Sequence, residues 1–164
     1  AQQLQIQLYW GEEEAALDTL MDFIMKTYQS SKRYRADKLD CGLAPFQQLY
    51  IYRICRRPGE SQDWLARTLC INKSNVARQL LSLEQSGFVT RSPDPNDRRI
   101  LRVYPTEKAK EIFPQVEQLI HEWETLVLEP FTAEERTVFI DLMKRVSVRS
   151  AELAGEESGA KKKG

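Results

Sequence analysis

Apolar residues recur at the three- and four-residue steps of a helix along most of the sequence. The exception is one stretch, residues 88–104. Within it, residues 88–91 and 100–104 are rich in apolar, β-branched and aromatic side chains and are typical of two strands. Pro93 and Pro95 exclude helix from the charged segment between them, which predicts a turn-rich loop. A single hairpin in an otherwise helical chain predicts a mostly α fold with a small β-hairpin.

Two short helices are expected directly before the hairpin. Ser61 is a good N-cap for the first, over about residues 62–69, and the second is expected between about Lys73 and Gly87. Two short helices joined by a tight turn form a helix-turn-helix, whose second helix can enter the major groove of DNA. We call the second helix the reading helix.

The reading helix has two different faces. Val76, Leu80 and Leu83 fall in a narrow sector at about 100° per residue and are expected to pack inward. The other face carries short polar side chains and one arginine, namely Ser74, Asn75, Arg78, Gln79 and Ser82. Side chains of these types suit base edges and phosphates, although an ordinary solvated face would have the same composition.

The predicted loop of the hairpin carries two adjacent arginines, Arg98 and Arg99. Arginines at such a tip can enter the narrow, negative minor groove beside a helix in the major groove. Asp97 can hold the Arg99 guanidinium by a charge-assisted hydrogen bond. A charged hairpin also serves solubility, but its position directly after the reading helix favours DNA binding.

The charge distribution supports this interpretation. The chain of 164 residues has no net charge, yet residues 53–102 contain ten basic and five acidic residues and the remainder carries the compensating −5. A basic middle between acidic flanks indicates a module that binds a polyanion.

The chain resembles the MarR family of bacterial transcriptional regulators. The resemblance is carried by four motifs, 58–66 (PGESQDWLA), 72–76 (NKSNV), 83–89 (LEQSGFV) and 94–99 (DPNDRR). It implies a winged helix-turn-helix flanked by N- and C-terminal dimerisation helices, which binds pseudo-palindromic double-stranded DNA as a homodimer. The family's DNA-binding positions fall on Lys73, Ser74, Asn75, Arg78 and Gln79 in the reading helix and on Asp97, Arg98 and Arg99 in the wing.

The sequence departs from the family pattern after the wing, where Pro105-Thr106 replaces the usual Leu-Thr and Ala109 stands in place of a glycine. Pro105 removes one backbone donor, and Thr106 can still cap the next helix. The resemblance also implies a regulator, expected to be a repressor, that a small molecule releases from DNA.

We expect one domain over 1–164, with a DNA-binding lobe at 43–105 and dimerisation helices at 12–40 and 106–153. The seam Ile112–Leu126 steps by three and four residues and needs a partner helix, with Pro114 marking a kink or a late start. Thr132 opens a capping box for the last helix. Intertwined terminal helices would bury these stripes across a two-fold axis, although they could instead cover the domain's own core. The tail at 155–164 has too little apolar content to fold.

The resemblance implies a small aromatic or phenolic effector, which we expect to bind in a cleft lined by Tyr28, Tyr50 and Trp64. Aromatic residues at helical spacing are also common in protein cores, so these three residues could instead be core residues. The alternative is a thiol sensor at Cys41, where a nearby helix start and Lys38 could lower the pKa of the thiol.

Several functions are disfavoured by the composition. Three cysteines at spacings of 14 and 15 residues with a single histidine match no zinc pattern, and Cys55 and Cys70 are expected to be buried apolar residues. We expect no metal, no cofactor and no enzymatic activity, because no convergent acid, base or nucleophile is evident.

Without an apolar run of about 18 residues or a leader, we expect a cytoplasmic protein with no membrane association. An acidic protein is the alternative partner to DNA.

Overall fold

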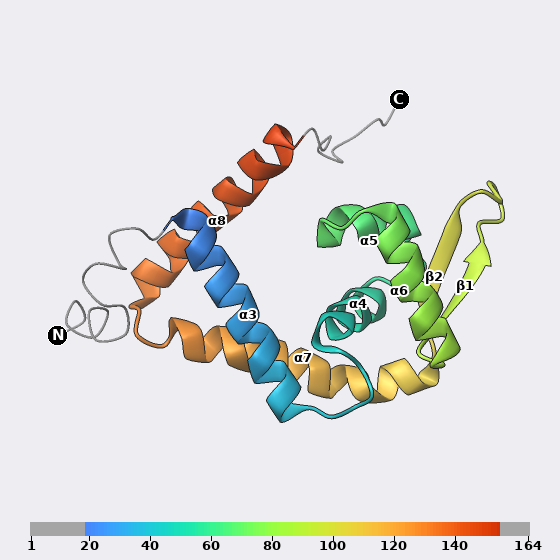
Figure 1. Ribbon diagram of the computed structural model, residues 1–164, viewed down its shortest axis with the longest axis horizontal. Helices are drawn as coiled ribbons and strands as arrows, with labels where there is room; N and C mark the ends of the chain where they lie inside the picture. Colours follow the sequence, from blue (N-terminus) through green and yellow to red (C-terminus); the bar gives the residue numbers. More distant parts are fainter. Residues whose placement is uncertain (1–18, 155–164) are drawn as a thin grey trace. The chain divides into compact units, whose positions relative to one another are not determined.

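The computed structural model describes residues 19–154, and these contain six helices and one antiparallel hairpin (Figure 1). The elements are α3 (Leu20–Lys38), α4 (Pro45–Arg56), α5 (Gln62–Leu69), α6 (Lys73–Gln85), β1 (Val89–Pro93), β2 (Leu101–Pro105), α7 (Glu107–Leu128) and α8 (Ala133–Leu153). The described residues divide into two compact units, one ending at Phe46 and the other beginning at Gln47, and each is described by itself. The predicted mostly α fold with a small hairpin is confirmed.

The first unit contains α3. Thr19 caps it, accepting a hydrogen bond from the backbone N–H of Asp22 while the Asp22 carboxylate accepts one from the Thr19 N–H. The helix ends at Lys38, one turn beyond the expected end near Tyr34, and the expected start near Glu12 lies outside the described residues. Six apolar side chains of α3 are exposed within the single chain, at Leu20, Met21, Phe23, Ile24, Met25 and Tyr28.

The second unit is built around the helix-turn-helix formed by α5 and α6. Ser61 and Asn72 cap these helices with side-chain oxygens that accept from the N–H groups of Trp64 and Asn75. The expected inward face of α6 is confirmed, since its three apolar side chains are at most 1% exposed. They are Val76, Leu80 and Leu83. Burial of such a stripe fixes the rotation of α6, so its polar face must point away from the core.

The hairpin is an antiparallel pair in which Val89 lies opposite Pro105 and Pro93 lies opposite Leu101. The first strand begins and ends one to two residues later than expected. A third segment joins its edge, because Ser61 forms a bridge with Arg102 and the Val103 N–H donates to the Glu60 carbonyl at 3.0 Å. The hairpin is therefore fixed to the corner between α4 and α5 as well as to α6.

Thr106 caps α7, as expected, and also donates from its hydroxyl to the Gly87 carbonyl at 2.7 Å. Pro114 lies inside α7 and does not delay its start, so the expectation of a late start is wrong. The capping box at Thr132 is confirmed. No residue of α8 is buried within the single chain. The tail expected at 155–164 lies outside the described residues.

The described part of the chain has no helix long and apolar enough to cross a membrane. Within the same residues, no cluster of three or more His, Cys, Asp or Glu side chains is placed to hold a metal ion.

Candidate nucleic-acid interface

Four of the five expected contact residues lie on the polar face of α6, and the fifth, Lys73, is the first residue of the helix. Lys73, Ser74 and Arg78 are exposed, and Asn75 and Gln79 are half-buried. Arg78 Nη2 donates to Asn75 Oδ1 at 3.1 Å, and Gln79 Oε1 accepts from Gln47 Nε2 of α4 at 3.4 Å. The structure therefore places Ser74, Asn75, Arg78 and Gln79 outside the buried stripe of α6, with Arg78 hydrogen-bonded to Asn75.

Lys73 is less available than the sequence indicates. Its Nζ lies 2.8 Å from Asp63 Oδ2 at the start of α5, and both side chains are more than half exposed. An ion pair in water at this distance contributes little stability. A phosphate oxygen would have to compete with Asp63 for this ammonium group.

A network of side chains fixes the hairpin to the reading helix. Arg91 on β1 donates from Nη2 to Glu84 Oε2 at 2.6 Å and from Nη1 to Gln62 Oε1 at 3.2 Å, and its backbone N–H donates to Glu84 Oε1. These bonds hold the pKa of Glu84 below its ordinary value, so the carboxylate stays charged. Elements α5, α6 and β1 consequently meet at one arginine, which sequence reasoning did not identify.

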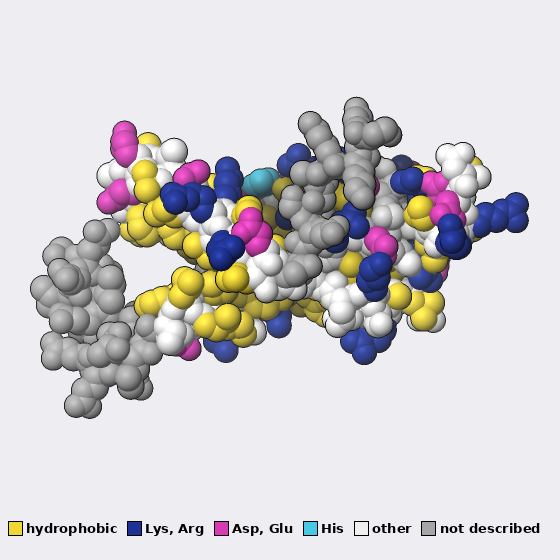
Figure 2. Space-filling model, turned by 90° about the horizontal axis from the view of Figure 1, so that it is seen from above, with side chains coloured by type: hydrophobic (Ala, Val, Ile, Leu, Met, Phe, Trp, Pro, Cys, Tyr) yellow, Lys and Arg dark blue, Asp and Glu magenta, His cyan; other side chains and the backbone are white. Residues whose placement is uncertain are grey.

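At the tip of the hairpin, Asp97 holds Arg99 as expected. Arg99 Nε donates to Asp97 Oδ1 at 3.0 Å and Nη2 donates to Oδ2 at 3.1 Å. This pairing lowers the pKa of Asp97. The Arg99 side chain is nevertheless 90% exposed, and Arg98 beside it is also exposed. The end of the second unit that carries the hairpin therefore presents Lys and Arg side chains to solvent (Figure 2). We call strands β1 and β2 with the loop 94–100 the wing.

A further acidic residue of the wing was missed. Asp94 is buried and accepts a charge-assisted hydrogen bond from Arg102 Nε, which lowers the pKa of Asp94. The signal available in the sequence was the spacing of Asp94 from Asn96, which is typical of an aspartate that accepts from the backbone two residues on.

Of the three residues expected to line an effector cleft, Tyr50 and Trp64 belong to the second unit, and only Trp64 lines a hollow there. Tyr50 is a core residue, 1% exposed, and burial raises the pKa of its hydroxyl. Tyr28 is an exposed residue of the other unit, with Lys32 Nζ 5.7 Å from its ring centre. The expectation that Tyr50 lines a cleft is wrong because its ring packs inward from α4.

Trp64, in contrast, lines a hollow of about 390 Å³ at the corner of α4 and α5. Its other lining residues are Tyr52, Arg53, Arg56 and Arg57. The guanidinium groups lie over the aromatic rings, with Arg57 5.7 Å from the Trp64 ring and Arg53 and Arg56 each 5.5 Å from the Tyr52 ring. Cations beside flat apolar surfaces suit a planar anion.

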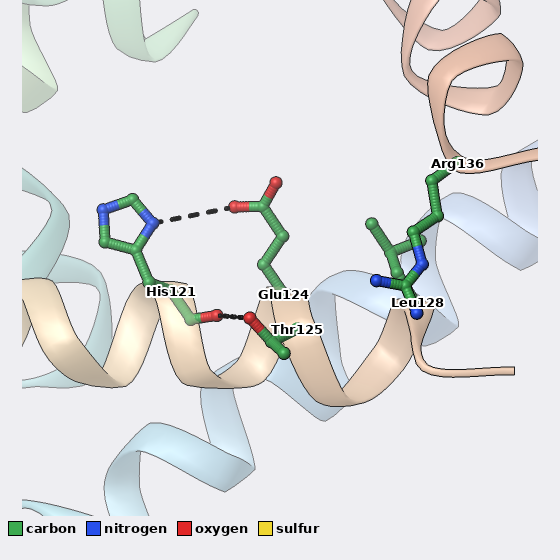
Figure 3. Close-up of a pocket in the computed structure, with 5 residues that line it drawn as sticks. All are labelled: His121, Glu124, Thr125, Leu128 and Arg136. Carbon is green, nitrogen blue, oxygen red and sulfur yellow. Dashed lines mark hydrogen bonds and ion pairs between the residues drawn. The ribbon is translucent and has the colours of Figure 1, made fainter. Parts of the chain in front are cut away.

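A second hollow of about 310 Å³ lies where α7 turns into α8 (Figure 3). His121, Glu124, Thr125 and Leu128 reach it from α7 and Arg136 from α8. His121 Nδ1 lies 3.9 Å from Glu124 Oε2, while Arg136 is engaged with the Phe131 and Glu129 carbonyls. The mixed charges define no ligand class.

The cysteines differ from expectation. Burial and the nearby Asp40 raise the pKa of Cys41, so the expected lowering is wrong. The ammonium group of Lys38 lies 5.6 Å from the centre of the Tyr34 ring. Cys55 is half-buried, and burial raises its pKa to about 11. Cys70 is exposed rather than buried, since it caps α5 in the left-handed conformation with φ of 53°.

Comparisons with known proteins agree with this geometry. A family model described as the MarR family matches residues 46–101. The uncharacterized HTH-type transcriptional regulator YybA of Bacillus subtilis (strain 168) is 33% identical over 107 residues, which cover 65% of this chain and 71% of that protein.

Many solved structures are similar in fold, and two of them illustrate the similarity. The crystal structure of MarR superposes with a TM-score of 0.72 at 30% identity and covers 85% of this chain and 96% of its own. A MarR family transcriptional regulator from Listeria monocytogenes, complexed with 26mer DNA, gives a TM-score of 0.76 at 24% identity over 82% of this chain and 90% of its own.

The fold and the accessible basic elements define a winged helix-turn-helix transcriptional regulator, a class of DNA-binding protein rather than of enzyme. The chain belongs to the MarR family.

Proposed function

We propose that this regulator binds a pseudo-palindromic operator as a homodimer and represses the genes beside it, acting in the cytoplasm. The observation that carries the proposal is the connection of its two basic elements. Arg78 on α6 and Arg99 on the wing belong to one lobe, which Arg91 ties together through Glu84 and Gln62. A rigid lobe can present a helix to the major groove and an arginine to the adjacent minor groove at once.

In this proposal, each residue type has a distinct role. Asn75, Arg78 and Gln79 meet base edges, Lys73 and Ser74 meet phosphates, and Arg98 and Arg99, the latter held by Asp97, meet the minor groove. The Listeria monocytogenes regulator that was solved with 26mer DNA shares this fold, which supports a DNA-binding role for the lobe.

The homodimer is proposed from the exposed apolar faces. On α8 the exposed apolar side chains are Val138, Phe139, Leu142, Met143, Val148 and Leu153. Because α8 buries none of its residues within one chain, a role in covering that chain's own core is disfavoured. Contact with the same helices of a second copy would remove this surface from water.

The test of DNA binding is selection of bound sequences from a random duplex library, with light scattering on the free protein and on the complex. We expect an inverted repeat with half-sites about 34–36 Å apart and a dimer in both samples. Competition with sheared genomic DNA at rising salt separates this from the alternative of an acidic protein partner. Loss of all duplex preference, or a monomer on DNA, would contradict the proposal.

The proposed effector is a small aromatic or phenolic anion held beside Trp64, where Arg57 offers a cation over the indole. By linkage, a ligand that weakens operator binding must itself bind more weakly in the presence of operator, by the same factor. We expect such acids to raise the thermal midpoint of the free protein and to release operator DNA. If acids bind without changing DNA affinity, the alternative of oxidation at Cys41 gains support despite the raised pKa of that thiol.

A further inference from the structure

The buried carboxylate of Asp94 organises the loop of the wing. Asp94 is only 5% exposed. Oδ1 accepts the backbone N–H groups of Asn96 at 2.8 Å and Asp97 at 3.1 Å, and Oδ2 accepts from Arg102 Nε. The backbone N–H of Asp94 also donates to the Ile100 carbonyl at 2.8 Å. Both ends of the loop are therefore held by the same residue.

Arg102 connects this loop to the corner between α4 and α5. Its Nη1 donates to the Gly59 carbonyl at 2.8 Å, and the Gly59 N–H donates to the Val103 carbonyl at 2.8 Å. Gly59 has φ of +82°, and a Cβ there would lie 3.0 Å from the Tyr104 ring. The acceptor for Arg102 thus lies on a closely fitted segment with little freedom to move.

The same series of hydrogen bonds ends, on the side of the loop, at Arg99. Asp94 fixes the N–H of Asp97, and the Asp97 carboxylate in turn holds the Arg99 guanidinium with bonds of 3.0 and 3.1 Å. Arg99 is 90% exposed and has no packing to orient it. Its direction is therefore set through Asp97 by the carboxylate of Asp94.

We propose that Asp94 is a positioning residue for DNA binding, which aims Arg99 by joining the wing loop to Arg102 and Gly59. The inference rests on the proposed function, since it requires Arg99 to meet DNA. A carboxylate close to a DNA-binding surface repels phosphates, so its presence there favours DNA binding only through the geometry that it imposes.

The substitution Asp94→Asn separates these two effects. Asparagine keeps an oxygen for the Asn96 and Asp97 N–H groups and removes the negative charge that faces Arg102. Charge alone predicts tighter binding to the selected operator, whereas loss of positioning predicts binding that is weaker by about tenfold, the size of one good contact. The matched control is Glu107→Gln, which makes the same change in net charge at an exposed carboxylate paired with Lys110 on α7. We expect the control to bind as the wild type does or slightly more tightly.

The decisive measurement repeats Asp94→Asn in an Arg99→Ala background. If Asp94 acts through Arg99, its substitution there weakens binding by less than about twofold, because the group that it positions is already gone. Tighter binding in the single variant, as in the control, or an equal loss in both backgrounds would overturn the proposal.

A second variant tests the same inference if Asp94→Asn does not fold. Arg102→Lys keeps the charge, but an ammonium cannot reproduce the guanidinium fork between Asp94 and Gly59. We expect a several-fold loss that also disappears without Arg99, and thermal unfolding shows which variants are folded at the assay temperature. If Asp94→Asn is unfolded there, the Arg102→Lys cycle decides. Failure of the wild type to select any duplex contradicts the proposed function itself, whereas a normal wild type with an unchanged Asp94→Asn variant contradicts only this inference.

Discussion

Arg78 donates a hydrogen bond of 3.1 Å to the Asn75 side chain, one turn earlier on the exposed face of α6. The bond uses one of the two lone pairs of the Asn75 oxygen and leaves the Asn75 amide N–H groups available to donate, while Arg78 retains four of the five N–H donors of a guanidinium. Two residues that could each read a base are therefore coupled before DNA arrives.

The first prediction concerns Arg78. Arg78→Ala should weaken binding to the selected operator by about 1–3 kcal/mol and relax base preference at one position in each half-site, because a bidentate contact to a base edge is lost. Titrations against the operator and its single-base variants measure both effects. Lys110→Ala is the control, because it removes one positive charge at an exposed residue of α7 that pairs with Glu107. An equal loss on every duplex would assign Arg78 to a phosphate.

The second prediction concerns the wing. Arg99→Ala should weaken binding and reduce the slope of log affinity against log salt by about 0.9, the value for one phosphate, while leaving the dimer intact. Asp97→Ala should cause part of the same loss, since Arg99 then moves freely. Unchanged binding in both variants would mean that the hairpin does not contact DNA.

The third prediction concerns acid stability. Arg91 lowers the pKa of Glu84 in the folded protein below the ordinary 4.5, so the pair stabilises the fold above that pH and its contribution disappears as the pH falls through the lowered value. Glu84→Gln should cost about 0.5–1 kcal/mol at neutral pH, a modest figure because the carboxylate is 35% exposed. Urea unfolding of both proteins from neutral pH down to about pH 3 should show the two stabilities converging. A constant difference across that range would contradict the assignment.

The fourth prediction compares two adjacent leucines of α6. Leu80 is 0% exposed and Leu81 is 46% exposed. Leu80→Ala should lower the free energy of unfolding by about 2–5 kcal/mol because it leaves a cavity, whereas Leu81→Ala should change it by less than about 0.5 kcal/mol. Equal effects would contradict the rotation of α6 about its axis that buries Leu80 and exposes Leu81.

The fifth prediction concerns the thiols. Burial raises the pKa of Cys55 to about 11, so only about one molecule in a thousand carries its thiolate near pH 8. Cys70 is exposed at the end of α5. Alkylation followed by mass spectrometry should label Cys70 first and Cys55 last, with Cys41 between them. Early labelling of Cys55 would contradict the packing of α4.

The local features of this fold were predictable from the sequence, because caps and apolar stripes depend on neighbours a few residues apart. Ser61, Thr106 and Thr132 cap the helices expected of them. The Asp97–Arg99 pair was also predictable, since its members are two residues apart.

Contacts that depend on the register of the hairpin, or on how it packs against the helices, were not predictable. The partner of Asp94 is Arg102 on the opposite strand. Arg91 on β1 donates to Glu84 of α6 and to Gln62 of α5. The exposure of Cys70 was missed for a related reason, because the left-handed turn that ends α5 points a normally buried residue type outward. The roles of the individual side chains on DNA stay predictions.

The cap at Thr106 makes α7 begin at the root of the wing, and the helix then continues through 22 residues to Leu128. At 1.5 Å per residue such a helix is about 33 Å long, so a tilt of about 5° displaces its far end by about 3 Å. That displacement is close to the rise of one base pair, about 3.4 Å. In the proposed dimer, a few degrees of tilt in α7 would be enough to move the lobe out of register with its half-site by one base pair.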